Sequence, residues 1–163
     1  MDKINHKKIL IYLFLLIIIF LLDRLSKIYI LHLAEINNIV DIYLTSFLNI
    51  YLIWNKGIAF GILSLDNAML YNIITLIIVS INILIITMII NYNDFRSFLL
   101  IMILGGSLGN LFDRVYFRSV PDFIDIHHGD FHWFVFNVAD IFITLGVLSL
   151  IMSELFFNKG IKK

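Results

Sequence analysis

The sequence predicts a mainly helical integral membrane protein, in which a bundle of four transmembrane helices carries a small β-structured platform. The first observation is composition, because 61% of the 163 residues are hydrophobic and only 15% are charged. The second is a mean hydropathy of +0.96, far outside the range of soluble domains. The third is that the apolar residues fall into four stretches, each long enough to cross roughly 30 Å of hydrocarbon. We therefore expect a single polytopic membrane domain over residues 1–163.

The four expected spans cover about residues 9–31, 68–90, 97–117 and 134–156. The second is the clearest, because no charged residue interrupts it and its length suffices at about 1.5 Å per residue. The first follows several lysines, as the apolar core of a secretory signal peptide does. No small-residue cleavage site follows its uncharged run, which ends at Leu22; Asp23, Arg24 and Lys27 come instead, so we retain it as a transmembrane span.

The connection between the first two spans, about residues 35–67, is too apolar for a solvated linker. Its central tract, FLNIYLIWNKGIAFGIL, alternates aromatic, β-branched and glycine residues. This pattern is typical of short strands joined by tight turns. We expect the connection to form a β-rich platform on the membrane surface.

Lysine and arginine are distributed unevenly between the two sides of the expected bundle. If the four spans alternate in direction, one side receives Lys3, Lys7, Lys8, Arg96, Lys159, Lys162 and Lys163. The loops on the other side hold mainly Lys56 and Arg118. The positive-inside rule then places both termini in the cytoplasm.

Chain order brings the polar residues of the spans to the opposite, outer boundary. An odd-numbered span ends there and an even-numbered span begins there. The residues that converge by this argument are Asp23, Asn110, Asp113, Arg114, Asn137 and Asp140. The connection 35–67, with Asn55, and the connection 117–134, with Asp122, lie on the same side. Ionisable groups at membrane depth are energetically expensive, so they mark function by default.

Helical spacing predicts how some of these residues are paired. Asp23 and Lys27 are four residues apart on one helix face, which favours a structural ion pair. Gly105 and Gly109 form a small-xxx-small pair that allows another helix to approach closely. Asp113 has a charged neighbour in sequence, so a salt-bridge role suits it as well as catalysis does.

Asp122 and Asp140 are the carboxylates best suited to chemistry. Asp122 follows the only proline, and Asp140 begins the last span without a cation next to it in sequence. Two carboxylates in a partly dry site do not both ionise readily, so the pair shares a proton. One oxygen then takes a proton from water while the other gives one to a carbonyl. The alternative is that both are interfacial residues solvated by water.

Two other motifs resemble known catalytic or metal-binding patterns. GGSLG at 105–109 matches a nucleophile pattern, but that motif needs a strand-to-helix turn and here lies within an apolar helical run. HHGDFH at 127–132 could hold zinc, although it lacks the HExxH spacing of a zinc protease and is expected in a flexible loop. Cysteine is absent, which removes disulfides and thiolate sites.

Two further classes of function remain open at this point. A small transporter or proton-conducting subunit would use Asp23, Asp113, Arg114 and Asp140 as a relay, but it would need polar groups through the whole bilayer. The other alternative to an enzyme that uses the Asp122–Asp140 pair is a purely structural assembly factor. Such a factor would tolerate an Asp140→Asn substitution, which a protease would not.

Five short motifs occur in a fixed order along the chain. They are Asp23 with Ser26 and Lys27, NKGIAFG at 55–61, GNLFDR at 109–114, VPDF at 120–123 and FNVAD at 136–140. In this order they resemble the motifs of lipoprotein signal peptidase, also called signal peptidase II, a family of aspartyl enzymes of bacterial membranes. The resemblance covers nearly all of the chain from the first motif to the last.

The resemblance implies four transmembrane helices with an extracytoplasmic β-cradle, and it implies aspartic endopeptidase activity. It makes Asp122 and Asp140 the catalytic pair. The substrate-binding or positioning residues that it implies are Asn55, Gly57, Asn110, Arg114 and Asn137. The supporting residues are Asp23, Lys27 and Asp113.

The implied substrate is a diacylglyceryl-modified prolipoprotein, cleaved before its lipidated cysteine at the outer face of the bacterial cytoplasmic (inner) membrane. The family also implies membrane lipids as partners and inhibition by globomycin-type cyclic peptides. No metal or other cofactor is needed for this reaction, and no nucleic-acid partner is expected. The roles of His127, His128 and His132 are left open by the sequence.

Overall fold

The computed structural model describes residues 6–57, 68–92 and 94–157. Part of the NKGIAFG motif, residues 58–61, and the rest of the expected β-rich connection up to residue 67 lie outside the described residues. The elements, in chain order, are α1 (His6–Asn37), β1 (Asp41–Thr45), β2 (Leu48–Asn55), α2 (Ala68–Asn91), α3 (Phe95–Tyr116), β3 (Val120–His128), β4 (Phe131–Phe136) and α4 (Val138–Phe157).

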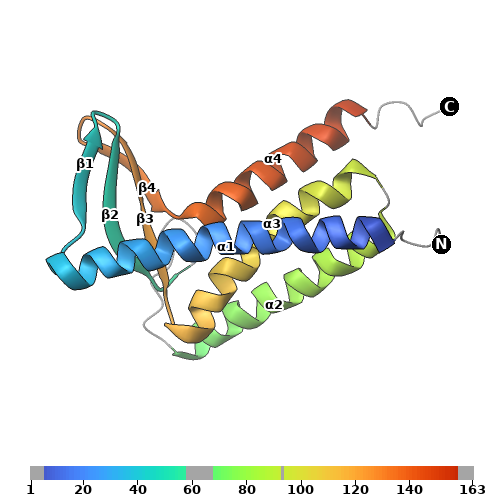
Figure 1. The fold of residues 1–163 in the computed structure, drawn as a ribbon, viewed down its shortest axis with the longest axis horizontal. Coiled ribbons are helices and arrows are strands. Elements are labelled where there is room, and N and C mark those ends of the chain that lie inside the picture. The colour runs from blue at the N-terminus through green and yellow to red at the C-terminus, as the bar shows by residue number, and fades with distance from the viewer. Residues whose placement is uncertain (1–5, 58–67, 93, 158–163) are drawn as a thin grey trace.

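Four helices in the described part of the chain are long and apolar enough to cross a membrane, and a small antiparallel sheet accompanies them. The expected fold class is therefore confirmed. Helix α3 is central, because it packs against α1, α2 and α4. The sheet lies at one end of the helices, and the start of α1 and the end of α4 lie at the other end (Figure 1).

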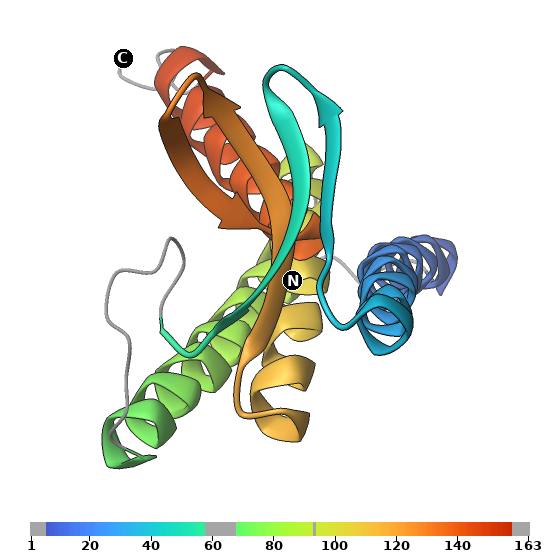
Figure 2. The ribbon, with the colours of Figure 1, turned by 90° about the vertical axis from the view of Figure 1, so that its left-hand side faces the viewer.

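The sheet has the strand order β1-β2-β3-β4, and all its neighbours are antiparallel. Seen from the sheet end, the β1–β2 and β3–β4 hairpins lie side by side across the ends of the helices, with α1 at their flank (Figure 2). The β1–β2 hairpin comes from the connection where strands were expected. Residues 127–132, for which the sequence predicts a flexible loop, instead belong to the β3–β4 hairpin, so that prediction is wrong.

The pattern of burial explains why the sequence does not predict the β3–β4 hairpin. The first four residues of β3 are all buried, so the strand lacks the apolar-polar alternation of a half-exposed strand. Phe123 of β3 packs with Ile30 of α1 and Val40 before β1 in a small core that joins the sheet to the bundle. Because residues 131–136 pair as β4, the last helix begins at Val138 rather than near residue 134.

Glycines on α3 set how closely the other helices approach. A Cβ added at Gly105 would lie 2.9 Å from Ile19 Cγ2, and one at Gly109 would lie 2.5 Å from Asp23 Oδ2. The expected small-residue pair therefore faces α1. Gly106, on another face of α3, lies against the Ala139 carbonyl of α4 in the same way. Both contacts place α1 and α4 close to the polar end of α3.

Candidate active site

Asp122 and Asp140 line one cavity at the junction of the sheet and the helices. The cavity has a volume of about 260 Å³, and its lining also includes Asn55, Asn110 and Arg114. Asp122 lies near the start of β3, whereas Asp140 lies in the first turn of α4. The chain therefore brings the two carboxylates together from a strand and from the helix that follows the next strand.

Asp122 is almost completely buried, with 2% of its surface exposed, and two side-chain amides hold it. Asn137 Nδ2 donates to Asp122 Oδ1 at 2.6 Å, and Asn55 Nδ2 donates to Asp122 Oδ2 at 2.9 Å. Burial, followed by the nearby Asp140 carboxylate, raises the pKa of Asp122 to about 7, while the two amide hydrogen bonds act in the opposite direction. This environment therefore favours a proton on the pair more strongly than water would.

Asp140 is fixed by a reciprocal contact with the residue that caps α4. The backbone N–H of Asn137 donates to Asp140 Oδ2 at 3.1 Å, and the backbone N–H of Asp140 donates to Asn137 Oδ1 at 3.2 Å. This arrangement is a capping box, in which two helix-end amides are satisfied by each other's side chains. Asn137 thereby contacts both carboxylates, since its amide nitrogen binds Asp122 and its backbone binds Asp140.

Asn110 of α3 completes the hydrogen bonds of Asp140. Its Nδ2 donates to Asp140 Oδ1 at 2.8 Å, while its Oδ1 accepts a hydrogen bond from Lys27 Nζ at 2.8 Å. The ammonium can only donate, so this contact determines which way the amide faces. Asn110 thus connects the carboxylate pair with a second polar cluster on α1 and α3.

The second cluster is a buried ion network, here called the ion cluster, made of Asp23, Arg24, Lys27 and Asp113. The i,i+4 ion pair expected on α1 is present, with Lys27 Nζ 2.8 Å from Asp23 Oδ1. Lys27 Nζ lies 2.7 Å from Asp113 Oδ2, and Arg24 Nη1 lies 2.6 Å from Asp113 Oδ1. Two carboxylates therefore meet two cations, and their formal charges cancel.

The ion cluster also supports the helix that carries Asp140. The backbone N–H of Ala139, in the first turn of α4, donates to Asp23 Oδ1 at 3.1 Å. A carboxylate at this position satisfies an otherwise unpaired amide and favours the positive end of the helix dipole. Asp23 therefore helps to hold α4 in place.

Arg114 and Gly57 meet at the side of the cavity. Arg114 Nη2 donates to the Gly57 carbonyl at 3.3 Å, and Arg114 Nη1 donates to the Asn110 carbonyl at 3.3 Å. Asn55 Oδ1 accepts a hydrogen bond from the Gly57 backbone N–H at 2.8 Å. Arg114 thereby ties the end of β2 to α3 and presents its guanidinium group to the cavity.

An apolar groove opens beside the cavity. It has a volume of about 390 Å³, and Asp140 lines both spaces. Its other lining residues come from β3, β4 and the first turns of α4, and they include Trp133, Phe136, Ile141 and Leu145. The carboxylate pair therefore has a polar cavity on one side and an apolar surface on the other.

The structure brings all the site residues proposed from the sequence to one end of the bundle, in two linked groups. Asp122, Asp140, Asn55, Asn110 and Asn137 form the first group, with Arg114 and Gly57 at its side. Asp23, Lys27 and Asp113 belong to the ion cluster, where the partners of Asp113 come from α1 rather than from its neighbour in sequence.

Arg24 is the residue that sequence reasoning missed. Its place after the first uncharged run suggests no particular partner, but its guanidinium contacts Asp113 and lies 4.8 Å from the centre of the Phe112 ring. The signal that could have found it is a second cation at membrane depth on the first span. Such a residue needs a partner on another helix.

Comparison with known proteins agrees with the geometry. The family described as signal peptidase (SPase) II matches residues 15–156. The chain is 52% identical to a lipoprotein signal peptidase of Pelagibacter ubique, over 97% of this chain and 95% of that protein. It is 36% identical to a lipoprotein signal peptidase of Aquifex aeolicus, over 99% and 96% of the two chains. A solved structure of a bacterial membrane enzyme, obtained by the in meso method, matches with a TM-score of 0.71 at 27% identity, over 93% of this chain and 92% of that one. The resemblance inferred from the five motifs is confirmed, and this chain belongs to the signal peptidase II family.

Proposed function

We propose that this chain is an aspartic endopeptidase in which Asp122 and Asp140 are the catalytic residues. Its substrate is a diacylglyceryl-modified prolipoprotein, which it cleaves just before the lipidated cysteine. The observation that carries the proposal is that both carboxylates line one small cavity and are held there by amide groups. Amides orient a carboxylate without neutralising it, so the pair keeps the capacity to exchange protons.

The reaction follows from the shared proton of the pair. The ionised carboxylate takes a proton from a water molecule, whose oxygen attacks the scissile carbonyl carbon. The protonated carboxyl group gives its proton to the carbonyl oxygen, so a tetrahedral diol forms. The first carboxyl group then gives its proton to the leaving amine as the C–N bond breaks, and the second carboxylate regains a proton from the diol. The products are a free carboxyl group and a free amine, and the pair returns to its starting state.

The groups around the pair are assigned positioning roles. Asn55, Asn110 and Asn137 hold the carboxylates in place, and Arg114 with Gly57 offers donors and backbone to the substrate chain. Positioning of this kind contributes by holding the reacting atoms close to their productive geometry. Asp23, Lys27 and Asp113 support the site through Asn110 and the start of α4.

The apolar groove beside Asp140 supports a lipid-bearing substrate. Its aromatic and aliphatic lining would accommodate the apolar signal helix or the acyl chains near the scissile bond. By the charge distribution of the sequence, both termini lie in the cytoplasm and the site faces the extracytoplasmic side of the inner membrane. A globomycin-type cyclic peptide would inhibit the enzyme by occupying the same cavity.

The test is a gel-shift assay with purified protein in detergent and a diacylglyceryl-modified prolipoprotein, with a chelator present throughout. Asp122→Asn and Asp140→Asn should each lower the cleavage rate by about 10³-fold, within the range that a positioned acid or base contributes. Asp130→Asn, on the exposed turn between β3 and β4, is the matched control and should cleave like the wild type. Normal cleavage by either cavity variant, or none by the wild type, would contradict the proposal.

A further inference from the structure

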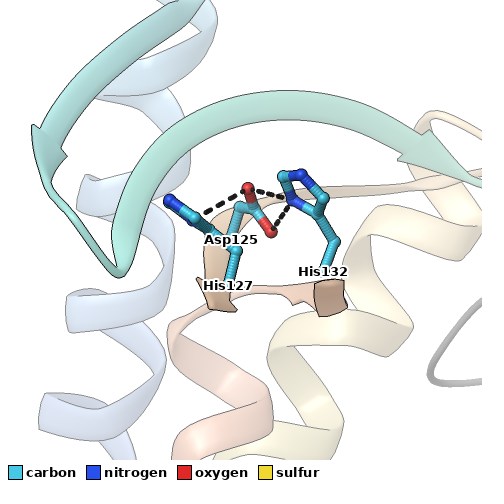
Figure 3. A group of neighbouring side chains, drawn as sticks. All are labelled: Asp125, His127 and His132. Atoms are coloured by element: carbon cyan, nitrogen blue, oxygen red, sulfur yellow. Dashed lines mark hydrogen bonds and ion pairs between the residues drawn. The ribbon is translucent and has the colours of Figure 1, made fainter. Parts of the chain in front are cut away.

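A second group of side chains with metal-binding chemistry lies on the sheet, away from the proposed catalytic pair. Asp125 and His127 belong to β3, and His132 belongs to β4. One donor atom from each residue lies within 4.8 Å of the others. Figure 3 shows the Asp125 carboxylate between the two imidazole rings, with all three side chains on the same side of the hairpin.

Pairing of β3 with β4 brings Asp125, His127 and His132 together, although their spacing in the sequence matches no known metal-binding motif. His127 and His132 are direct partners across the hairpin, and the pairing is irregular between Asp125 and His127. Residues two apart on a strand share a face, and a break in register can re-aim one of their side chains. The flexible loop expected from the sequence is in fact a paired hairpin, and this removes one of the two arguments against metal binding there.

The distances suit a single small cation. His132 Nδ1 lies 2.8 Å from Asp125 Oδ2, and His127 Nδ1 lies 3.6 Å from the same oxygen. Two donors at the usual zinc distance of about 2.1 Å and a tetrahedral angle lie roughly 3.4 Å apart, between these two values. Two imidazoles and one carboxylate form a donor set typical of divalent transition metals.

A second, independent observation is that polar atoms beside this group have unmet hydrogen-bonding capacity. His127 Nδ1 is buried without a hydrogen-bond partner within the described chain, and only 9% of the His127 side chain is exposed. Asn49, whose Cα pairs with that of Asp125 across β2 and β3, has a buried Oδ1 in the same condition. Buried polar atoms without partners are uncommon, and both of these atoms are free to bind a ligand.

The group is accessible from outside. A groove of about 500 Å³ over the sheet is lined by Asn49, Asp125 and His132, together with Asp41 and Tyr51 of the β1–β2 hairpin. The His132 side chain is 55% exposed, so an ion can reach the carboxylate without disturbing the core. An entry path is one of the requirements for a metal site.

We propose that Asp125, His127 and His132 form a binding site for a divalent transition metal ion, with Zn²⁺ as the first ion to test. The side-chain oxygen of Asn49, Oδ1, or a water molecule would complete the coordination. An ion held there would link β3 to β4 and stabilise the hairpin, which carries Asp122 near its start and leads into Asn137. The site is structural and lies outside the proposed proton chemistry.

Metal binding is measured on the full-length chain in detergent, without a polyhistidine tag, after chelator treatment and removal of the chelator. Zn²⁺ is titrated by calorimetry, and Co²⁺ is titrated by its visible absorption bands. The wild type should bind one ion per chain. His127→Ala and His132→Ala should each weaken binding by roughly tenfold or more, at least as much as loss of a group that only supports a ligand. His128→Ala, on the same hairpin but outside the group, is the matched control and should bind like the wild type.

Two further measurements separate metal binding from an ordinary histidine–aspartate hydrogen bond. Asp125→Asn keeps the size of the side chain and a hydrogen-bond acceptor for His132 but is a poorer ligand, so Zn²⁺ affinity should fall. Saturating Zn²⁺ should raise the thermal unfolding temperature of the wild type but not that of His132→Ala, because only the wild type gains binding energy when folded. No saturable binding by the wild type, or equal binding by all variants, would overturn the proposal.

Discussion

The carboxylate pair and the ion cluster are both buried, lie at the same end of the bundle and share Asn110, yet they are neutralised in different ways. In the ion cluster, each carboxylate lies within 3.0 Å of both cations. In the carboxylate pair, the hydrogen bonds to Asp122 and Asp140 come from amides. Cations hold a carboxylate in its charged form, whereas at Asp122 burial and the neighbouring Asp140 raise the pKa despite the opposing amide hydrogen bonds, so a proton stays available. The difference indicates which aspartates support the fold and which are available for acid–base chemistry.

The largest expected effect tests the ion cluster as a unit of stability. Lys27→Met leaves two buried carboxylates with one cation, and removing one partner of a buried pair costs about 3–5 kcal/mol. Thermal or mixed-micelle unfolding in detergent measures the loss. Lys27→Met combined with Asp113→Asn restores equal charge and should recover part of the stability. If the double variant is no more stable than Lys27→Met, charge balance is not what stabilises the cluster.

A steric test at the same place should have a smaller effect. In Gly109→Ala the new Cβ would lie 2.5 Å from Asp23 Oδ2, so α1 and α3 must separate or the carboxylate must move. Overpacking of this kind costs about 1–3 kcal/mol. Val115→Ala, on the exposed face of the same helix, is the control and should change the free energy of unfolding by about 0.5 kcal/mol or less. Equal stability of the two variants would mean that α1 does not pack on α3 this closely.

The carboxylate pair is tested through Asn137, which has two separable contacts. Asn137→Ala removes the hydrogen bond to Asp122 and should lower kcat by roughly 10–100-fold, since a hydrogen bond to a charged group contributes about 1.5–3 kcal/mol. It also removes the cap of α4, which costs about 1 kcal/mol of stability. Asn137→Ser should restore the cap and the stability but leave kcat low. Recovery of kcat in the serine variant would show that the cap, rather than the contact with Asp122, matters for the rate.

The smallest expected effect concerns the pH dependence of cleavage. The pKa of Asp122 is about 7, so the shared proton is lost and the rate falls as pH rises through about 7. The hydrogen bond from Asn55 lowers this pKa. Asn55→Ala should therefore raise it and move the alkaline limb of the pH–rate profile to higher pH. An alkaline limb that stays in place or moves to lower pH would contradict the assignment of this limb to Asp122.

Much of the fold was predictable because its signals are local. Uninterrupted apolar runs predict the helices, and chain order predicts that Asp23, Asn110, Asn137 and Asp140 converge. The β3–β4 hairpin was not predictable in this way, because its register depends on pairing with β2 and its buried start shows no alternation. The contact between Arg24 and Asp113 joins residues 89 apart, and sequence spacing carries no information about such a contact.

Asp113 is synthesised well after its partners on α1, because it follows Lys27 by 86 residues. At roughly 5–20 residues per second, Lys27 is synthesised about 4–17 s before this partner. Asp23, four residues before Lys27 and adjacent to Arg24, is available to both cations from the start. The first span therefore carries its own counter-ion from the start, and the arrival of α3 adds Asp113 to complete the network.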